Sequence, residues 1–332
     1  MKPTNLLAVI LLLCAVAAAR GAGLPADVAQ RLGEGLPAAF VPLPASGANK
    51  IFPLVSDTRR TPDRKYAVTL GETPFVVTAV SDDGKTVELT VPAGLQTTET
   101  TNRWFKAEDV FGKVKWRVDA YEPNVACLAY FSGGKGPLEL VARIPSGTAG
   151  TLLGTVTAGK TALKLVHVAQ PYARDGVDAP HLLALVRENP PVTTQAEYDA
   201  RVKQLMAEHA FREGRPWGKG FPSLLGNTGT FECAAMAADF VTYMVDGGLK
   251  TGERFEKADE IRAGDVISVP GHFFAVVSRK GAQLTTIEGN MNESVSRSPT
   301  RYSVKDGKLM RGGADAQFEY GYHNWAPPAK KK

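Results

Sequence analysis

The chain contains few cysteines and few histidines for its length, with three Cys and five His among 332 residues. A secreted protein held together by disulfides has more cysteines at closer spacing, so we expect a packed core to stabilise this fold. The sequence has no His-Glu-x-x-His pattern and no closely spaced cysteine pair. No glycine-rich loop follows a strand and opens a helix. These absences argue against a metal, nucleotide or other cofactor site.

A net charge is also absent from most of the chain. Lys and Arg number 39 against 34 Asp and Glu, which gives a formal charge of +5. Lys2, Arg20 and the basic tail at residues 328–332, with its three lysines, account for the whole excess. Residues 23–329 are therefore balanced, and the sequence gives no evidence for a nucleic-acid partner.

Long apolar runs are absent except at the N-terminus. Lys2 precedes an unbroken apolar run from Leu6 to Ala19, and small residues follow, which is typical of a secretory signal peptide. The run is shorter than the roughly 20 residues that cross a bilayer, so we expect no stable membrane span. Cleavage after Ala19 and cleavage after Ala22 both fit. We expect residues 1–22 to be a signal peptide and the protein to be secreted or periplasmic.

The composition of the next 170 or so residues favours strands over helices. Residues 23–48 are rich in Ala, Gly, Pro and Leu without periodicity, so we expect a helix-prone lead and a linker. Short β-branched and aromatic runs then alternate with turn signals, which predicts two β-rich domains at residues 49–118 and 119–190. Phe75 to Val80 and Thr86 to Val91 flank a turn signal and predict a hairpin.

Later runs in the same region also predict strands, at Leu138 to Ile144, Leu152 to Val156 and Ala162 to Val168. Cys127 lies in an apolar, strand-like run, and we expect it to be a buried small hydrophobe.

Two stretches of this β-rich region resemble bacterial SH3-like domains. One closes with Trp104 to Val110, and the other runs from Val141 to Thr148 and on through Gly154 to Gly159. The resemblance implies one or two small barrels that bind wall or peptide ligands. A structural β-domain that only packs on its neighbour is the alternative.

The pattern becomes helical after Pro190-Pro191. Thr194 and Glu197 fit a capping box, and apolar residues recur at helical spacing to about Arg212. We expect a third domain over residues 191–327.

A second helix is expected after the loop at residues 226–230, with Thr230 as its N-cap. Cys233 then lies in the first turn, where unsatisfied N–H groups and the helix dipole favour a thiolate. Taken alone, Cys233 also fits the first residue of the apolar stripe of this helix.

Three strands follow the second helix, and polar residues lie at their ends. With Lys280-Gly281 at the tip of a hairpin, His272 lies opposite Gly289 and beside Glu288 and Asn290. A histidine beside a carboxylate and an amide has the arrangement of a base and its orienting partner. Together with a thiol at a helix N-terminus, it is the set that nucleophilic acyl transfer requires.

These residues resemble the CHAP family of cysteine, histidine-dependent amidohydrolases/peptidases, within the broader NlpC and papain-like superfamily. The resemblance covers roughly residues 200 to 300 and implies an α+β domain whose cysteine-bearing helix packs on an antiparallel sheet. It also implies an enzyme that cleaves peptidoglycan amide bonds, as an N-acetylmuramoyl-alanine amidase or an endopeptidase. The segments that carry it are Cys233, Ala263-Gly264-Asp265-Val266-Ile267, Gly271 to Val277 and Ile287-Glu288-Gly289-Asn290.

The resemblance also implies the roles of individual residues. Cys233 is the nucleophile, His272 the general base and acid, and Glu288 with Asn290 the orienting groups. The sequence departs from the family where two alanines follow the cysteine and no Gln directly precedes it. We therefore expect the oxyanion to be bound by the Cys233 backbone N–H and the Asn227 amide. An ordinary turn asparagine is the alternative for Asn227.

Two other functions fit the same sequence. One is an inactive relative that binds cell wall or peptide, against which the complete Cys, His, Glu and Asn set argues. The other is acyl or peptidyl transfer to an amine, which uses the same residues as hydrolysis. We expect peptidoglycan or a peptide as the partner, and the sequence does not predict an oligomeric state.

Overall fold

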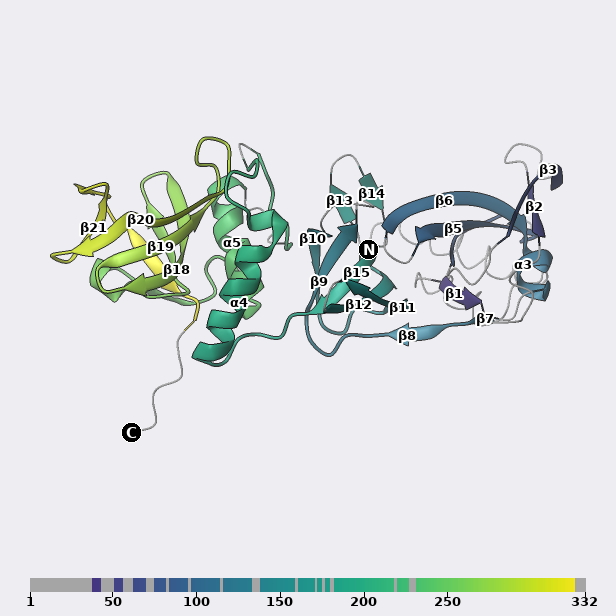
Figure 1. Ribbon diagram of the computed structural model, residues 1–332, viewed down its shortest axis with the longest axis horizontal. Helices are drawn as coiled ribbons and strands as arrows, with labels where there is room; N and C mark the ends of the chain where they lie inside the picture. Colours follow the sequence, from purple (N-terminus) through teal and green to yellow (C-terminus); the bar gives the residue numbers. More distant parts are fainter. Residues whose placement is uncertain are drawn as a thin grey trace, which may run out of the picture. The chain divides into compact units, whose positions relative to one another are not determined.

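The computed structural model forms two compact units, each described separately below (Figure 1). The predicted signal peptide, Asn227, Thr230 and the basic tail lie outside the described residues. The described residues are 38–42, 51–55, 62–69, 75–81, 84–94, 97–113, 116–132, 138–158, 161–170, 172–174, 177–179, 182–217, 220–226 and 231–325.

Neither unit is continuous in sequence. The first unit takes the described residues within Met1–Asn124, Ala129–Pro137 and Ile144–Arg187, and the second takes those within Val125–Leu128, Leu138–Arg143 and Glu188–Lys332. The three predicted domains, with boundaries at 118 and 190, stay a prediction.

Three sheets lie wholly within the first unit. Their strand orders are β6-β5-β4-β1-β7, β2-β3 and β13-β14. The elements are β1 (Ala38–Pro42), β2 (Ile51–Val55), β3 (Pro62–Thr69), β4 (Phe75–Val80), β5 (Thr86–Gly94), β6 (Thr97–Lys106), α3 (Ala107–Lys113), β7 (Trp116–Arg117), β13 (Tyr172–Arg174) and β14 (Val177–Ala179).

The predicted hairpin is confirmed, and the predicted linker needs one correction. Strands β4 and β5 pair antiparallel, from Val76 with Thr90 to Val80 with Val87. Strand β1 falls inside residues 23–48, where the sequence predicts a linker, and pairs with β4 and β7. Its ladder hydrogen bonds to two neighbours explain why a segment with weak periodicity is a strand.

A six-stranded sheet has the order β10-β9-β15-β12-β11-β8. The strands predicted near residues 138–144, 152–156 and 162–168 are confirmed as β10, β11 and β12. Cys127 is fully buried in β9, as expected. The SH3-like barrels stay a prediction. The strands are β8 (Asp119–Tyr121), β9 (Cys127–Ser132), β10 (Leu138–Ile144), β11 (Gly150–Ala158), β12 (Thr161–Val168) and β15 (Leu182–Glu188).

The first helix of the second unit, α4 (Gln195–Ala207), begins at the predicted capping box. Thr194 accepts a hydrogen bond from the Glu197 N–H, and the Glu197 carboxylate accepts one from the Thr194 N–H. The helix ends before Arg212, because Glu208 has an extended backbone and a single 3₁₀ turn, η1 (His209–Phe211), follows.

The helix that carries Cys233, α5 (Glu232–Val245), is buried on all sides from Ala235 to Met244. The apolar stripe expected from the sequence is therefore only part of its buried surface. Phe231, and not Thr230, is the N-cap, and it makes no side-chain capping bond. The helix contacts α4, β18 (His272–Lys280) and β19 (Gln283–Glu288), and Figure 1 shows α4 and α5 beside the sheet.

The second unit is built on an eight-stranded sheet of order β16-β23-β17-β18-β19-β20-β21-β22. Every neighbouring pair is antiparallel. One face encloses a core that includes Phe274, Tyr302 and Leu309. The fold is thus mixed and rich in strands. The remaining elements are β16 (Glu253–Phe255), η2 (Ala258–Glu260), β17 (Val266–Val269), β20 (Ser296–Lys305), β21 (Lys308–Arg311), β22 (Ala314–Asp315) and β23 (Tyr320–His323).

No helix among the described residues is long and apolar enough to cross a membrane.

A buried carboxylate on α5 fixes the loop that leads towards the start of this helix. Asp239 is fully buried and accepts hydrogen bonds from the Ser223 hydroxyl and from the N–H groups of Leu224 and Leu225. We expect Asp239→Ala to lower the free energy of unfolding by about 3 kcal/mol, because it leaves buried donors unsatisfied. Urea denaturation measures this effect. The exposed Asp199→Ala on α4 is the control, expected to cost under about 0.5 kcal/mol; equal losses would contradict the prediction.

Candidate active site

Cys233 lies in the first turn of α5 and is partly exposed. Its thiol is hydrogen-bonded to the His272 side chain and to the backbone of Phe273. Helix α5 packs on β18, which His272 opens. The contact between helix and sheet therefore brings together a thiol and an imidazole that are far apart in sequence.

His272 is in turn bonded to Glu288, at 3.0 Å between its Nε2 and the carboxylate Oε2. The second ring nitrogen, Nδ1, is left for the thiol. The side chain of His272 is 15% exposed and that of Glu288 is fully buried. Cys233, His272 and Glu288 thus form a continuous chain of hydrogen bonds, and Glu288 is the member most remote from solvent.

The register that creates this contact differs by one residue from the predicted one. Lys280 pairs with Gln283, so the tip of the hairpin is Gly281-Ala282, and a bulge follows between Val276 and Ser278. Beyond the bulge Ala275 pairs with Ile287. Glu288 is therefore on the same face of the sheet as His272, because side chains alternate between faces. The predicted register would have placed Gly289 on that face.

The Glu288 carboxylate has further partners in the core of the sheet. Oε1 accepts hydrogen bonds from Thr286 Oγ1 and Arg301 Nη1, both at 3.1 Å. Oε2 lies 3.5 Å from the Tyr302 hydroxyl. A buried carboxylate is stable only when its lone pairs are bonded and its charge is matched, and Arg301 supplies the matching charge.

The electrostatics of the site favour a thiolate beside an imidazolium. Burial raises the pKa of the Cys233 thiol, but the hydrogen bonds with His272 and the Phe273 backbone outweigh it and leave the pKa below its usual value. Burial lowers the pKa of His272, whereas its bonds with Cys233 and Glu288 outweigh burial and raise it to about 9. Each charge stabilises the other.

The orienting role that the resemblance gives Asn290 stays a prediction, and the side-chain bond that the structure shows for it goes to another residue. Its side-chain amide donates to the Glu232 carboxylate at 2.9 Å. The carboxylate of Glu288 is the orienting contact that the structure shows for His272. Asn227, the expected oxyanion donor, is outside the described residues, so its role stays a prediction.

Sequence reasoning missed several residues around this centre. Arg301 and Tyr302 come from β20, and an irregularity in the pairing of β19 with β20, which the sequence does not predict, decides their contact with Glu288. Glu232 directly precedes Cys233, and this adjacency is the one feature of the sequence that could have pointed to a role for Glu232 in the site. Trp217 is buried, and its indole N–H donates to the Glu232 carbonyl.

The second unit contains another histidine bonded to a buried carboxylate. His323 Nδ1 lies 3.0 Å from Asp265 Oδ1, and the Asp265 side chain is fully buried. Burial raises the pKa of Asp265 to about 8. Among the described residues, the contacts of Asp265 and His323 include Arg262 and Phe255 but no thiol, so the pair resembles His272–Glu288 without a nucleophile beside it.

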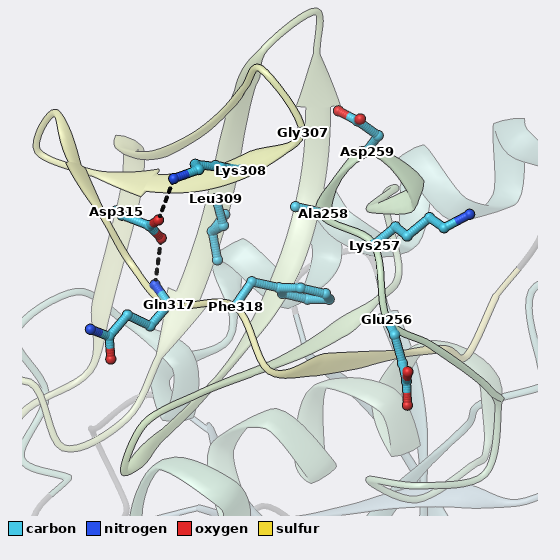
Figure 2. Close-up of a pocket in the computed structure, with 10 residues that line it drawn as sticks. All are labelled: Glu256, Lys257, Ala258, Asp259, Gly307, Lys308, Leu309, Asp315, Gln317 and Phe318. Carbon is cyan, nitrogen blue, oxygen red and sulfur yellow. Dashed lines mark hydrogen bonds and ion pairs between the residues drawn. The ribbon is translucent and has the colours of Figure 1, made fainter.

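A pocket of about 470 Å³ lies elsewhere on the second unit, lined from η2, β21 and β22. Figure 2 shows Leu309 and Phe318 at its centre with charged side chains around them, including the ion pair of Lys308 and Asp315 at 3.2 Å. Cys233, His272 and Glu288 do not line it. Among the described residues, no three His, Cys, Asp or Glu side chains group as a metal site requires.

Comparisons with known proteins add little to this geometry. No family model and no curated protein matches the sequence. The solved structure of NlpC2 from Trichomonas vaginalis is similar over 83% of this chain and 96% of that chain, at 12% identity and a TM-score of 0.24. At this TM-score the two structures are too different for a family or function to be inferred from the match. The functional case rests on the site.

Proposed function

We propose that the protein is an exported cysteine hydrolase that cleaves amide bonds, with peptidoglycan as its substrate. The observation that carries the proposal is the chain of hydrogen bonds from Cys233 through His272 to Glu288. It combines a thiol of lowered pKa, a histidine of raised pKa and a buried carboxylate that fixes the ring. A papain-like domain, with α5 packed on the antiparallel sheet, is part of the proposal.

The mechanism follows from the protonation states. The Cys233 thiolate attacks the amide carbonyl carbon, and the carbonyl oxygen takes the negative charge, bound by the Cys233 N–H. The His272 imidazolium gives its proton to the leaving nitrogen, the C–N bond breaks, and a thioester forms. Neutral His272 then takes a proton from water, whose oxygen displaces the thiolate and releases the acid. Glu288 stabilises the imidazolium and orients the ring throughout.

The choice of peptidoglycan rests on two features of the sequence. The apolar N-terminal run predicts export, and the segments around Cys233, His272 and Glu288 resemble a family that acts on cell-wall amides. The SH3-like resemblance in the first unit adds a proposed role in binding wall or peptide.

Purified mature protein is expected to solubilise peptidoglycan. The new carboxyl group is either the lactyl carboxylate on the sugar, released by an amidase, or an amino-acid carboxyl within the peptide, released by an endopeptidase; a new amino group forms in both cases. Mass spectrometry of the products distinguishes an endopeptidase from an amidase. Cys233→Ala is expected to lower the rate by at least about 10³-fold while it retains wall binding. A matched Cys127→Ala variant removes the other described thiol and should keep the activity. Wall binding without products in the wild type would favour an inactive binding protein, and coupling to an added amine would favour a transferase.

A further inference from the structure

The residue before the proposed nucleophile has an unusual backbone. Glu232 has φ +57°, in the left-handed region, although Cys233 and the rest of α5 continue as a regular helix. A residue with a side chain adopts that region at a cost, and it stays there only where surrounding contacts require it.

Contacts engage every polar group of Glu232. Its N–H donates to the Phe221 carbonyl at 2.8 Å, and its own carbonyl accepts from Trp217 Nε1 at 2.8 Å. One carboxylate oxygen accepts from the Gly220 N–H at 3.2 Å and the other from Asn290 Nδ2 at 2.9 Å. The position of Glu232 is therefore defined from two other segments of the chain.

Asn290 is fixed in the same way at the end of β19. It too has a left-handed backbone, with φ +58°, and its N–H donates to the Trp217 carbonyl at 2.8 Å. Gly289 has no room for a side chain, since a Cβ there would lie 2.7 Å from Trp217 Nε1. Asn290 follows Glu288 by two residues, and Glu232 precedes Cys233 by one. A bond between their side chains thus joins the segment of the carboxylate to the segment of the nucleophile.

We propose that Glu232 and Asn290 form a clamp that sets the position of the Cys233 thiol against the His272–Glu288 pair. The effect of this clamp on the rate of hydrolysis rests on the proposed function. The sequence suggested that Asn290 orients His272, whereas here it holds Glu232. Both are positioning residues, because each acts through a neighbour. Displacing a reacting group by about 1 Å costs on the order of 100-fold in rate, so the clamp affects the rate strongly.

The test compares Glu232→Ala and Asn290→Ala with a matched control, Asn292→Ala. Asn292 is also an asparagine with a left-handed backbone, at φ +52°, but it is exposed. The two clamp variants are expected to lower kcat/KM by about 10- to 100-fold. They should also move the midpoint of Cys233 alkylation with iodoacetamide to higher pH, because the thiolate loses part of its contact with the imidazolium. The control should change neither.

A swapped pair tests the bond itself. Asn290→Asp alone sets two carboxylates against each other and should be the most damaging single change. Combined with Glu232→Gln, it restores a donor and an acceptor in exchanged places, with the Gln oxygen still available to the Gly220 N–H. The double variant should recover both kcat/KM and the alkylation midpoint to within about 5-fold and 0.5 pH units of wild type.

The outcomes separate the clamp from the proposed function. If wild type hydrolyses its substrate and the clamp variants match Asn292→Ala in both measurements, the clamp is overturned and the function stands. If wild type does not hydrolyse, the alkylation midpoint still decides the clamp. Should an alanine variant fail to fold by circular dichroism, the swapped pair decides instead, and a double variant no better than Asn290→Asp alone overturns the proposal.

Discussion

Cys233 of the folded protein should react with iodoacetamide at pH 6 about 10- to 100-fold faster than an unperturbed thiol. A free cysteine has a pKa of about 8.5 and is less than about 1% thiolate at that pH. The hydrogen bonds of Cys233 leave its pKa below the usual value, so the thiolate persists to more acidic pH. The increase in the alkylation rate is smaller than the increase in thiolate fraction, because a thiolate of lower pKa is a weaker nucleophile.

Variants and the denatured protein supply the controls for this measurement. His272→Ala removes the partner that lowers the thiol pKa, so its labelling at pH 6 should fall to the rate of the denatured protein. Cys127 is fully buried in β9 and should react only on unfolding. If the native wild type is labelled no faster than the denatured chain, the proposed ion pair of the Cys233 thiolate and the His272 imidazolium is contradicted.

The same pair predicts the pH profile of hydrolysis. Activity requires thiolate and imidazolium together, so it should fall at acid pH as Cys233 is protonated and at alkaline pH as His272 loses its proton. The pKa of His272 is raised to about 9, which places the alkaline limb near that value. A limb near the unperturbed histidine value of about 6.5 would contradict the raised pKa.

Local signals in the sequence predict local structure well. The capping box of Thr194 and Glu197 involves neighbouring residues, and its bonds form as expected. The hairpin of β4 and β5 follows from a turn signal between two β-branched runs. The predicted N-cap of α5, Thr230, is wrong by one residue, because the N-cap is Phe231 and no side chain caps the helix. Contacts with Phe221, Trp217 and Asn290 hold Glu232 at this position instead.

Contacts between distant segments explain what the sequence could not predict. His272 and Glu288 could be placed side by side because one hairpin joins them, but the bulge near Val277 decides which face Glu288 occupies. The Arg301 partner of Glu288 comes from the next strand, and its contact depends on a second irregularity in the pairing of β19 with β20. Strand β1 has weak periodicity, and its pairing with β4 and β7 identifies it.

Glu288→Gln is expected to lower kcat/KM by on the order of 10³-fold, although it changes only one atom of the side chain. A neutral amide stabilises the imidazolium less than the carboxylate that now lies 3.0 Å from His272 Nε2. The pKa of His272 should therefore fall, and that of the Cys233 thiol should rise with it, because the two groups stabilise each other's charge. Both the alkaline limb of hydrolysis and the midpoint of alkylation should move accordingly.

Glu288→Gln should also lower the stability of the fold, and this effect must be measured separately from the loss of kcat/KM. Arg301 loses the buried carboxylate that matches its charge, so the free energy of unfolding should fall by about 3 kcal/mol. Asp265→Asn is the matched control, because Asp265 is also a fully buried carboxylate bonded to a histidine. Burial raises the pKa of Asp265 to about 8, so an amide resembles the protonated carboxyl that predominates at neutral pH.

The two variants together decide whether Glu288 acts on the chemistry or only on the fold. Asp265→Asn should leave the alkylation midpoint of Cys233 in place, whatever it costs in stability. Glu288→Gln should shift that midpoint to higher pH in protein that urea denaturation shows to be folded. Equal midpoints in both variants would mean that Glu288 only stabilises the core of the sheet. A shift confined to Glu288→Gln would mean that the negative charge of Glu288 lowers the pKa of the Cys233 thiol. The effect would act through His272, which is hydrogen-bonded to Glu288.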